Sequence, residues 1–442
     1  MRSNLLQFGW SLFLAFGLLT PLAAQQELGT HFLRQHWQAS LTNPAFMTEH
    51  TIEIGLPSFY FNSATNGLDF DQLVRTTVEG QNVVNGEALI ANQSENNLIL
   101  ADFHTETFRL GLRFQDLQIS FHHGLRFNAY LNYPASLAQF IFLGNASAVG
   151  ETLALGPDIQ LTGYNEFALG LAHRVGRLGI GARAKLLTGI GNASTENRRA
   201  DLFTDEDIYQ LTLDTDILLN TSSYFRINSL TDFDLQVGVD DFTAGDLFNS
   251  NLGFALDFGL TYDLSDRWQI AASVVDLGGI QWSENVVNYR SNTNLAYDGI
   301  AVDSLLQSAS IPLSETLDSL GELLTFSETT DNYQTALPLK VYLSSRYQFG
   351  DSWAVGGLVH LVHFRETTNW ALSLNAQRRL GKVLSLGLSY SIRHDHFANL
   401  GLQATAQLGP IGLLVMMDNV LASNGSNNGL SFNLRTGLNL AF

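Results

Sequence analysis

An alternation of apolar and polar residues with a period of two recurs along most of this chain. It is clearest in the last segment, 430–442, where Phe432 and Leu434 fall on one face while Asn433 and Arg435 fall on the other. Successive side chains of a β-strand point to opposite sides, so this period is that of a strand. We therefore expect an all-β fold.

The alternating segments are too long and too charged for a soluble β-sandwich. They run for roughly 10–13 residues, against about 5–6 in globular proteins. Arg109, Arg126 and Lys340 stand in mid-segment, opposite the apolar face. A sandwich core would have to bury these charges without compensation, whereas a membrane barrel presents its apolar face to lipid and its polar face to a lumen. The pattern predicts a transmembrane antiparallel β-barrel.

Short and long connections between the segments predict how many strands the barrel has. Each short connection joins two alternating segments and so marks a hairpin. These connections are Gln115-Asp116, Gly176-Arg177, Ser265-Asp266, Gly350-Asp351, Leu380-Gly381 and Gly409-Pro410. Twelve strands from these hairpins, a first strand near Thr51–Phe61 and the last segment give about 14 strands, an even number as expected.

The other connections are long and polar, at about 62–97, 132–160, 191–250 and 279–336. Outer-membrane barrels show this asymmetry, with short periplasmic turns and long extracellular loops. Within 191–250, Asp207–Leu219 could add a hairpin, or the strands could extend beyond the membrane. Phe140–Leu143 and Val302–Leu324 are expected to be short helical or irregular pieces in the loops, and the second could be a lid over the barrel or a docking face for a partner.

Residues 1–24 are expected to be a secretory signal peptide. Arg2 is followed by the apolar run Leu12–Leu19 and by the small pair Ala23-Ala24, an order typical of export signals. This arrangement predicts passage through the inner membrane of a Gram-negative cell.

Residues 25–48 are expected to form a plug, and 49–442 the barrel. A 14-stranded barrel is wider than the eight-stranded kind that its own side chains can fill, so an empty one would leak. The segment carries enough apolar residues to pack against an inner wall: Leu28, Phe32, Leu33, Trp37, Leu41 and Phe46. A periplasmic tail that only caps the barrel is the alternative interpretation.

Composition and motifs exclude several classes of function. The chain has 23 Lys and Arg against 42 Asp and Glu, a net charge of −19, and nucleic-acid binding needs a basic face. Its lack of Cys excludes disulfides, thiolate metal sites and Cys nucleophiles. It carries no local catalytic, metal-binding or phosphate-binding motif, so we expect no enzyme activity, no cofactor and no metal site.

The most informative polar residues are seven cations that share the lumen-facing positions of their strands. We expect most of them to pair with lumen acids such as Glu166 or Asp257, while a minority could bind the carboxylate of an amphipathic ligand. They are Arg109, Arg113, Arg126, Arg183, Lys185, Lys340 and Arg346.

The C-terminus resembles the β-signal by which the barrel assembly machinery recognises outer-membrane proteins. That signal ends in a polar residue, a glycine, a hydrophobic residue and a terminal aromatic at fixed spacing. Arg435, Gly437, Leu440 and Phe442 occupy those places. The resemblance implies that this machinery inserts the chain into the outer membrane, where lipid surrounds it.

Asn43-Pro44-Ala45 resembles the N-terminal hatch of the FadL-like family, the long-chain fatty-acid transporters, which have 14 strands and a plug. Accessory barrels of type IX secretion in Bacteroidota carry a similar segment. The stretches 164–195, 254–282 and 337–347 resemble an uncharacterised Bacteroidota family of FadL-like proteins. These resemblances imply passive passage of a small hydrophobic or amphipathic ligand, or alternatively a scaffold or shuttle that binds a partner in a secretion or surface-protein complex.

Overall fold

In the computed structural model, the described residues are 28–65, 74–76, 82–84, 93–145, 148–223, 225–227, 233–235, 249–297, 326–365, 367–393, 399–420 and 431–442. The expected signal peptide and the expected helical piece Val302–Leu324 lie outside them.

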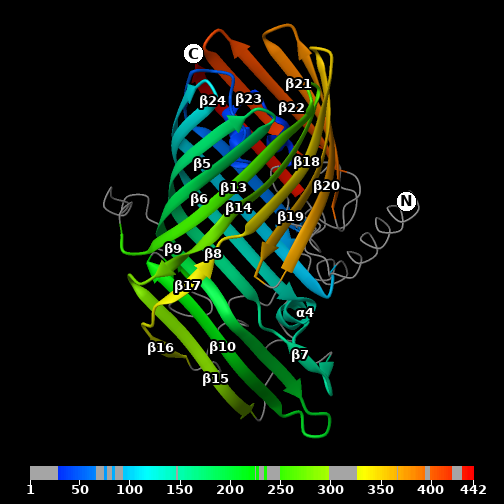
Figure 1. Cartoon of the computed structure of the whole chain (residues 1–442). Helices are drawn as coiled ribbons and strands as arrows, with labels where there is room; N and C mark the ends of the chain where they lie inside the picture. Colours follow the sequence, from blue (N-terminus) through cyan, green and yellow to red (C-terminus); the bar gives the residue numbers. More distant parts are fainter. Residues whose placement is uncertain are drawn as a thin grey trace, which may run out of the picture.

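Within this part of the chain, 14 antiparallel strands close a barrel, as expected (Figure 1). The last strand pairs with both halves of the first and so completes the wall. In chain order the wall consists of β1 (Ile52–Gly55) with β2 (Ser58–Thr65), β5 (Asn96–Phe114), β6 (Leu117–Pro134), β8 (Asp158–Val175), β9 (Leu178–Thr204), β13 (Leu252–Ser265), β14 (Trp268–Trp282), β17 (Tyr333–Ala336) with β18 (Leu339–Phe349), β19 (Trp353–Phe364), β20 (Thr367–Leu380), β21 (Leu384–Arg393), β22 (Asn399–Leu408), β23 (Ile411–Met417) and β24 (Ser431–Ala441).

Two of the wall strands are each broken into two pieces, and a proline lies at each break. Pro57 separates β1 from β2, and Pro338 separates β17 from β18. Proline has no backbone N–H to give to a neighbouring strand, so the hydrogen-bonded ladder is interrupted there. Both pieces still pair with the same neighbour, β24 in the first case and β14 in the second.

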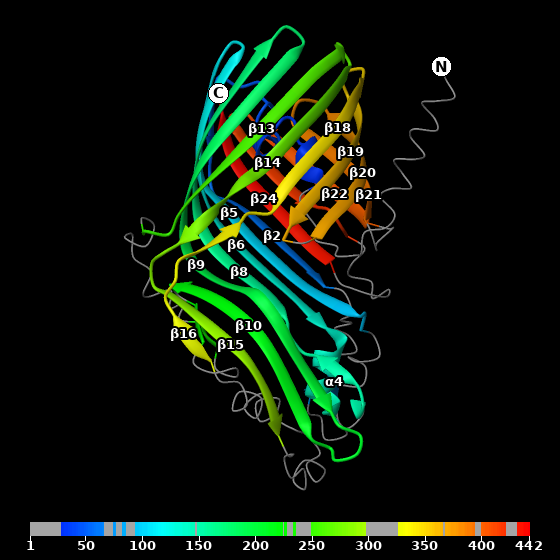
Figure 2. The ribbon, with the colours of Figure 1, turned by 60° about the horizontal axis from the view of Figure 1, so that its bottom comes forward.

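All six expected short turns lie at one end of the barrel, which is also the end of the C-terminus (Figure 1). Gly176 and Gly350 adopt positive φ values of 59° and 56°, a conformation that glycine takes without steric cost. At the opposite end the strands run on beyond the barrel (Figure 2).

The extension at that opposite end accounts for residues 191–250, where the sequence left open whether a hairpin is added or the strands extend. The strand β9 has 27 residues, and its outer part pairs with β10 (Leu211–Ser223), which pairs with β15 (Val286–Tyr297). The expected extra hairpin is therefore an extension outside the wall. Three short elements belong to the same end of the molecule: α4 (Ala135–Leu143), β7 (Thr152–Ala154) and β16 (Ser327–Thr329). Two further two-stranded sheets are separate from the barrel sheet: β3 (Val74–Thr76) with β4 (Asn82–Val84), and β11 (Phe225–Ile227) with β12 (Phe233–Leu235).

The alternation of the sequence corresponds to the two faces of the wall. In β24, Phe432 is 41% exposed on the outside, whereas Arg435 is 1% exposed on the inside. Large apolar side chains cover the outside of the other strands as well, for example Phe59, Phe121, Leu169, Leu260, Leu343, Leu388 and Val415. Such a wall suits a lipid surrounding. Among the described helices, none has the length and apolarity needed to cross a membrane.

The N-terminal segment lies inside the barrel, near the short-turn end (Figure 2). It contains two 3₁₀ turns, η2 (Gly29–Phe32) and η3 (Trp37–Leu41). Its apolar side chains are buried, with Phe32 and Trp37 each 1% exposed. The fold thus includes the expected N-terminal plug segment.

Candidate ligand cavity and plug

The Asn43-Pro44-Ala45 motif fastens the plug to the barrel wall. The Asn43 side-chain amide donates hydrogen bonds to the backbone carbonyls of Leu260 (3.3 Å) and Ala272 (3.1 Å). Its oxygen accepts one from the backbone N–H of Ala45 (2.9 Å). A buried amide whose donors and acceptor are satisfied holds its position, so this motif is an anchor of the plug.

Glycines leave the inner wall bare where the plug touches it. A Cβ atom on Gly181 would overlap the backbone of Pro44, and one on Gly259 would overlap Asn43. A Cβ atom on Gly356 would come within 2.6 Å of the Phe32 ring. The plug can approach this closely because glycine has no side chain.

His31 joins the plug to another side of the wall. Its ring nitrogens lie 2.9 Å from the Thr42 hydroxyl and 2.7 Å from the Ser344 hydroxyl, and the ring stacks on Tyr342. Burial holds the pKa of His31 well below its ordinary value and lowers the pKa of His36 to about 4. The docked plug therefore holds neutral histidines at neutral pH.

A network of paired charges crosses the lumen beside the plug. The ammonium of Lys185 lies 3.0 Å from Asp257 and 3.7 Å from Glu166, and it also pairs with Asp276. Four cationic and four acidic side chains take part, so their charges cancel: Arg126, Arg183, Lys185 and Lys340 with Glu106, Glu166, Asp257 and Asp276.

The network also contacts the plug. The guanidinium of Arg183 reaches Asp257 at 3.0 Å and donates to the backbone carbonyl of Ser40. His122 shares Glu166 with Arg126, at 2.8 and 3.4 Å. Buried charges need partners and hydrogen bonds to be tolerated, and these groups have both. The network therefore fixes the wall strands and the plug relative to one another.

The remaining expected lumen cations have their own surroundings. Arg109 pairs with Glu53 at 3.0 Å, and its guanidinium lies 5.1 Å from the ring of Trp37 in the plug. Arg113 donates to the backbone carbonyl of Thr48. Arg346 has the plug residue Arg34 as an electrostatic neighbour. Five of the seven expected cations are thus paired with acids.

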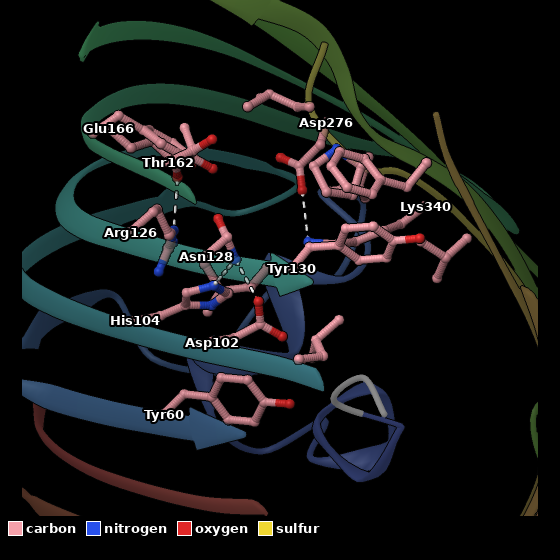
Figure 3. Close-up of a pocket in the computed structure, with 18 of the residues that line it drawn as sticks. Tyr60, Asp102, His104, Arg126, Asn128, Tyr130, Thr162, Glu166, Asp276 and Lys340 are labelled. Carbon is pink, nitrogen blue, oxygen red and sulfur yellow. Dashed lines mark hydrogen bonds and ion pairs between the residues drawn. The ribbon is translucent and has the colours of Figure 1, made fainter. Parts of the chain in front are cut away.

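A cavity of about 110 Å³ lies against the plug (Figure 3). This is several times the volume of about 10–15 Å³ that one water needs. Its lining includes Ala336, Phe364 and Thr367, which lie at the strand ends opposite the short turns. Leu41 and Thr42 of the plug form part of its lining. One part of the wall is apolar, with Leu98, Leu100, Tyr130, Val275, Val362 and Phe364, and another part belongs to the charge network, with Glu106, Arg126, Glu166, Lys185, Asp276 and Lys340.

The sequence did not single out a further polar group in this cavity. Asn128 donates to Asp102 at 2.6 Å and lies 3.3 Å from His104 (Figure 3). Outside the cavity lining, Asn62 donates to the other oxygen of Asp102 at 3.0 Å. Asn128 has the same parity in β6 as Arg126, so strand alternation alone is a signal that could have found it.

The residues of the expected assembly signal divide between the two faces of β24. The Arg435 guanidinium is buried, 5.0 Å from the ring of Tyr60. Gly437 faces Gln38 of the plug. Phe442 is 59% exposed on the outside. The described residues hold no group of three or more His, Cys, Asp or Glu side chains arranged to bind a metal.

Comparisons with known proteins find one family model and solved structures of little sequence similarity. A family model described as "Family of unknown function (DUF5723)" matches residues 44–418. No curated protein matches significantly. Similar solved structures include the TodX deltaS2S3 mutant monoaromatic hydrocarbon channel (10% identity, 92% of this chain and 95% of that one, TM-score 0.48), the Ralstonia pickettii toluene transporter TbuX (10%, 92% and 94%, 0.44) and a Pseudomonas aeruginosa FadL homologue (9%, 92% and 93%, 0.44).

Proposed function

This chain belongs to the family of unknown function DUF5723, and we propose from its own structure that it is an outer-membrane barrel for the passive passage of small hydrophobic or amphipathic molecules. The observation that carries the proposal is the cavity. It is lined by apolar side chains from β5, β14 and β19 and reaches the plug at Leu41 and Thr42. Ligand sites are typically concave and largely apolar, with a few placed polar groups.

The way in which the plug is held supports a gate. Neutral hydrogen bonds, hydrogen bonds from Arg113 and Arg183, neutral histidines and glycine contacts fasten it, and none of these is covalent. Each neutral hydrogen bond contributes only about 0.5–1.5 kcal/mol. A modest rearrangement of the plug would therefore connect the cavity to the short-turn end, and we propose that ligand passage depends on this movement.

Location in the outer membrane is part of the same proposal. The apolar outer face of the wall suits lipid, and the short turns lie together at one end, which we place in the periplasm. We propose that the barrel assembly machinery inserts the chain and that its terminal β-signal, which ends at Phe442, is the segment recognised.

The test is to fill the cavity. Val362 lines the cavity and is 4% exposed, whereas Val359 in the same strand is 40% exposed on the outside. Three cultures of a Gram-negative host would produce the natural protein, the Val362→Trp variant and the Val359→Trp variant. The amount of labelled dodecanol that the cells accumulate would be measured in each. We expect Val362→Trp to reduce accumulation to the level of cells without the barrel, and Val359→Trp to leave it unchanged.

Equal accumulation by both variants, with equal amounts of folded barrel, would refute passage through this cavity. The alternative of a scaffold or shuttle for a secretion or surface-protein complex would then become the better hypothesis. That role depends on surfaces outside the lumen, so Val362→Trp would not affect it.

A further inference from the structure

A groove lies on the outer face of the barrel, across the neighbouring strands β14, β18, β19, β20 and β21 (Figure 1). Its volume is about 620 Å³. The large side chains that line it belong to the outside of the wall, where Leu374 is 67% exposed. They are Trp268, Tyr347, Val355, Leu374, Leu388 and Tyr390. An apolar cavity of about 150 Å³ holds one benzene molecule, so the groove has room for a hydrocarbon chain.

The groove exists because the outer face carries small side chains at this level. Ser345 of β18 and Gly357 of β19 are cross-strand partners, and Ala376 lines the groove from β20. A Cβ atom added to Gly357 would meet only Leu374, at 3.7 Å. The side chains around an unfilled hollow lose dispersion contacts. A hydrocarbon chain of the surrounding lipid therefore gains contacts by entering it.

A cation stands at the end of the groove that is nearer the short turns. Arg378 follows Ala376 by two residues in β20, so it lies on the same face of the strand, about 7 Å further along. Arg378 is exposed, and its guanidinium lies 5.1 Å from the ring of Trp353. The groove thus joins an apolar hollow to a positive charge.

Two further exposed cations lie in the turns at this end, Arg267 between β13 and β14 and Lys382 between β20 and β21. The acids of these turns and of the turn between β18 and β19 are Asp266 and Asp351. Cations therefore outnumber acids here, although the chain as a whole carries a net charge of −19. The ion pairs of the described residues include neither Arg378 nor these two cations. This edge of the groove can accept an anion.

We propose that the groove binds an anionic phospholipid of the periplasmic leaflet. One acyl chain lies in the groove and Arg378 binds the phosphate, because the planar fork of a guanidinium matches phosphate oxygens. Trp268 and Tyr347 suit this place, since Trp and Tyr are enriched where the hydrocarbon of a membrane meets water. The inference rests on the outer-membrane location proposed above and is independent of passage through the lumen.

The test identifies the lipid that stays on the barrel. Purified full-length protein in uncharged detergent would receive equal amounts of phosphatidylglycerol and phosphatidylcholine, and native mass spectrometry would measure the lipid that remains bound. We expect the natural chain to retain phosphatidylglycerol in preference to phosphatidylcholine. Gly357→Trp fills the groove and should abolish this retention. Arg378→Met should reduce the preference about tenfold, as for a lost charge-assisted hydrogen bond.

Two matched variants are the controls. Leu169→Trp adds the same ring at an outer position of β8 that is 60% exposed, and Arg177→Met removes the same charge at another exposed turn. Both should retain phosphatidylglycerol as the natural chain does.

Three results would overturn the proposal. The first is equal retention by Gly357→Trp and the natural chain, with both barrels still shifting on heating in a gel. The second is an absence of preference in the natural chain, or a preference that Arg378→Met leaves unchanged. The third is a dimer of the natural chain that Gly357→Trp separates, because a second copy would then cover the groove.

The same variants separate this inference from the proposed passage of ligands. Gly357 lies on the lipid side of the wall, so Gly357→Trp should accumulate as much dodecanol as the natural chain. A natural chain that retains phosphatidylglycerol without accumulating dodecanol would support the lipid site and count against passage. The reverse result would support passage and overturn the lipid site.

Discussion

Replacement of Lys185 by Met should destabilise the barrel severely, because it leaves buried carboxylates without their shared cation. Lys185 is 3% exposed and lies 3.0 Å from Asp257. At an effective dielectric constant of about 20, two charges at that distance attract by about 5.5 kcal/mol. Removing the ammonium also removes the cost of burying it, which offsets part of that attraction. Breaking a buried pair costs about 3–5 kcal/mol in total, and we expect a loss in this range.

The measurement is the free energy of unfolding in urea, with the barrel in lipid vesicles and the folded fraction followed by its shift in a gel. Lys382→Met, at an exposed turn, is the control and should change it by less than about 0.5 kcal/mol. Asp276→Asn, added to Lys185→Met, removes the surplus negative charge and should restore about 1–2 kcal/mol. Asn tolerates the positive φ of 66° at this position.

A Lys185→Met barrel as stable as Lys382→Met would refute the view that the network is tightly paired. It would mean that water enters the lumen and solvates these carboxylates. A double variant less stable than Lys185→Met alone would instead show that Asp276 acts through Lys340 rather than through Lys185.

Three further predictions concern the plug and the assembly signal. Gly181→Ala should displace the plug and raise the conductance of the barrel in planar bilayers, whereas Gly357→Ala, where a Cβ atom would meet only ordinary contacts, should not. Deletion of Phe442 should reduce the amount of heat-modifiable barrel in the membrane fraction, and a normal amount would count against the signal. Docking of the plug should weaken as pH falls from about 6.5 toward 4, because His31 and His36 take up protons when the plug is released but not while they are buried. The conductance of the barrel should therefore rise over that pH range. The rise should be smaller when both histidines are replaced by Asn.

Strand alternation was sufficient to predict the wall of the barrel, because lipid on one side and a polar lumen on the other impose opposite chemistry on successive residues. Parity predicts that Arg126, Arg183 and Lys185 share the lumen face of their strands, and all three side chains are buried. It could not show which acids they meet, since pairs such as Lys185 with Asp276 join strands β9 and β14, which are not adjacent in the wall. Such contacts depend on the stagger and tilt of the strands in the closed barrel, which no local sequence pattern contains.

Other features had no signal in the sequence. The contact of Gly181 and Gly259 with Asn43-Pro44-Ala45 depends on how the plug folds, which no strand pattern contains. The length of β9 was ambiguous, because a strand that leaves the membrane and one that turns back into it have the same period of two.

The glycine-lined seat of the plug implies an order of assembly. Residues 28–48 precede every strand of the wall, yet their contacts reach Gly181 in β9, Gly259 in β13 and Gly437 in β24. Because that seat is complete only when β24 has joined β1 and β2, the N-terminal segment cannot make all of its contacts with the wall until the last strand has closed the ring.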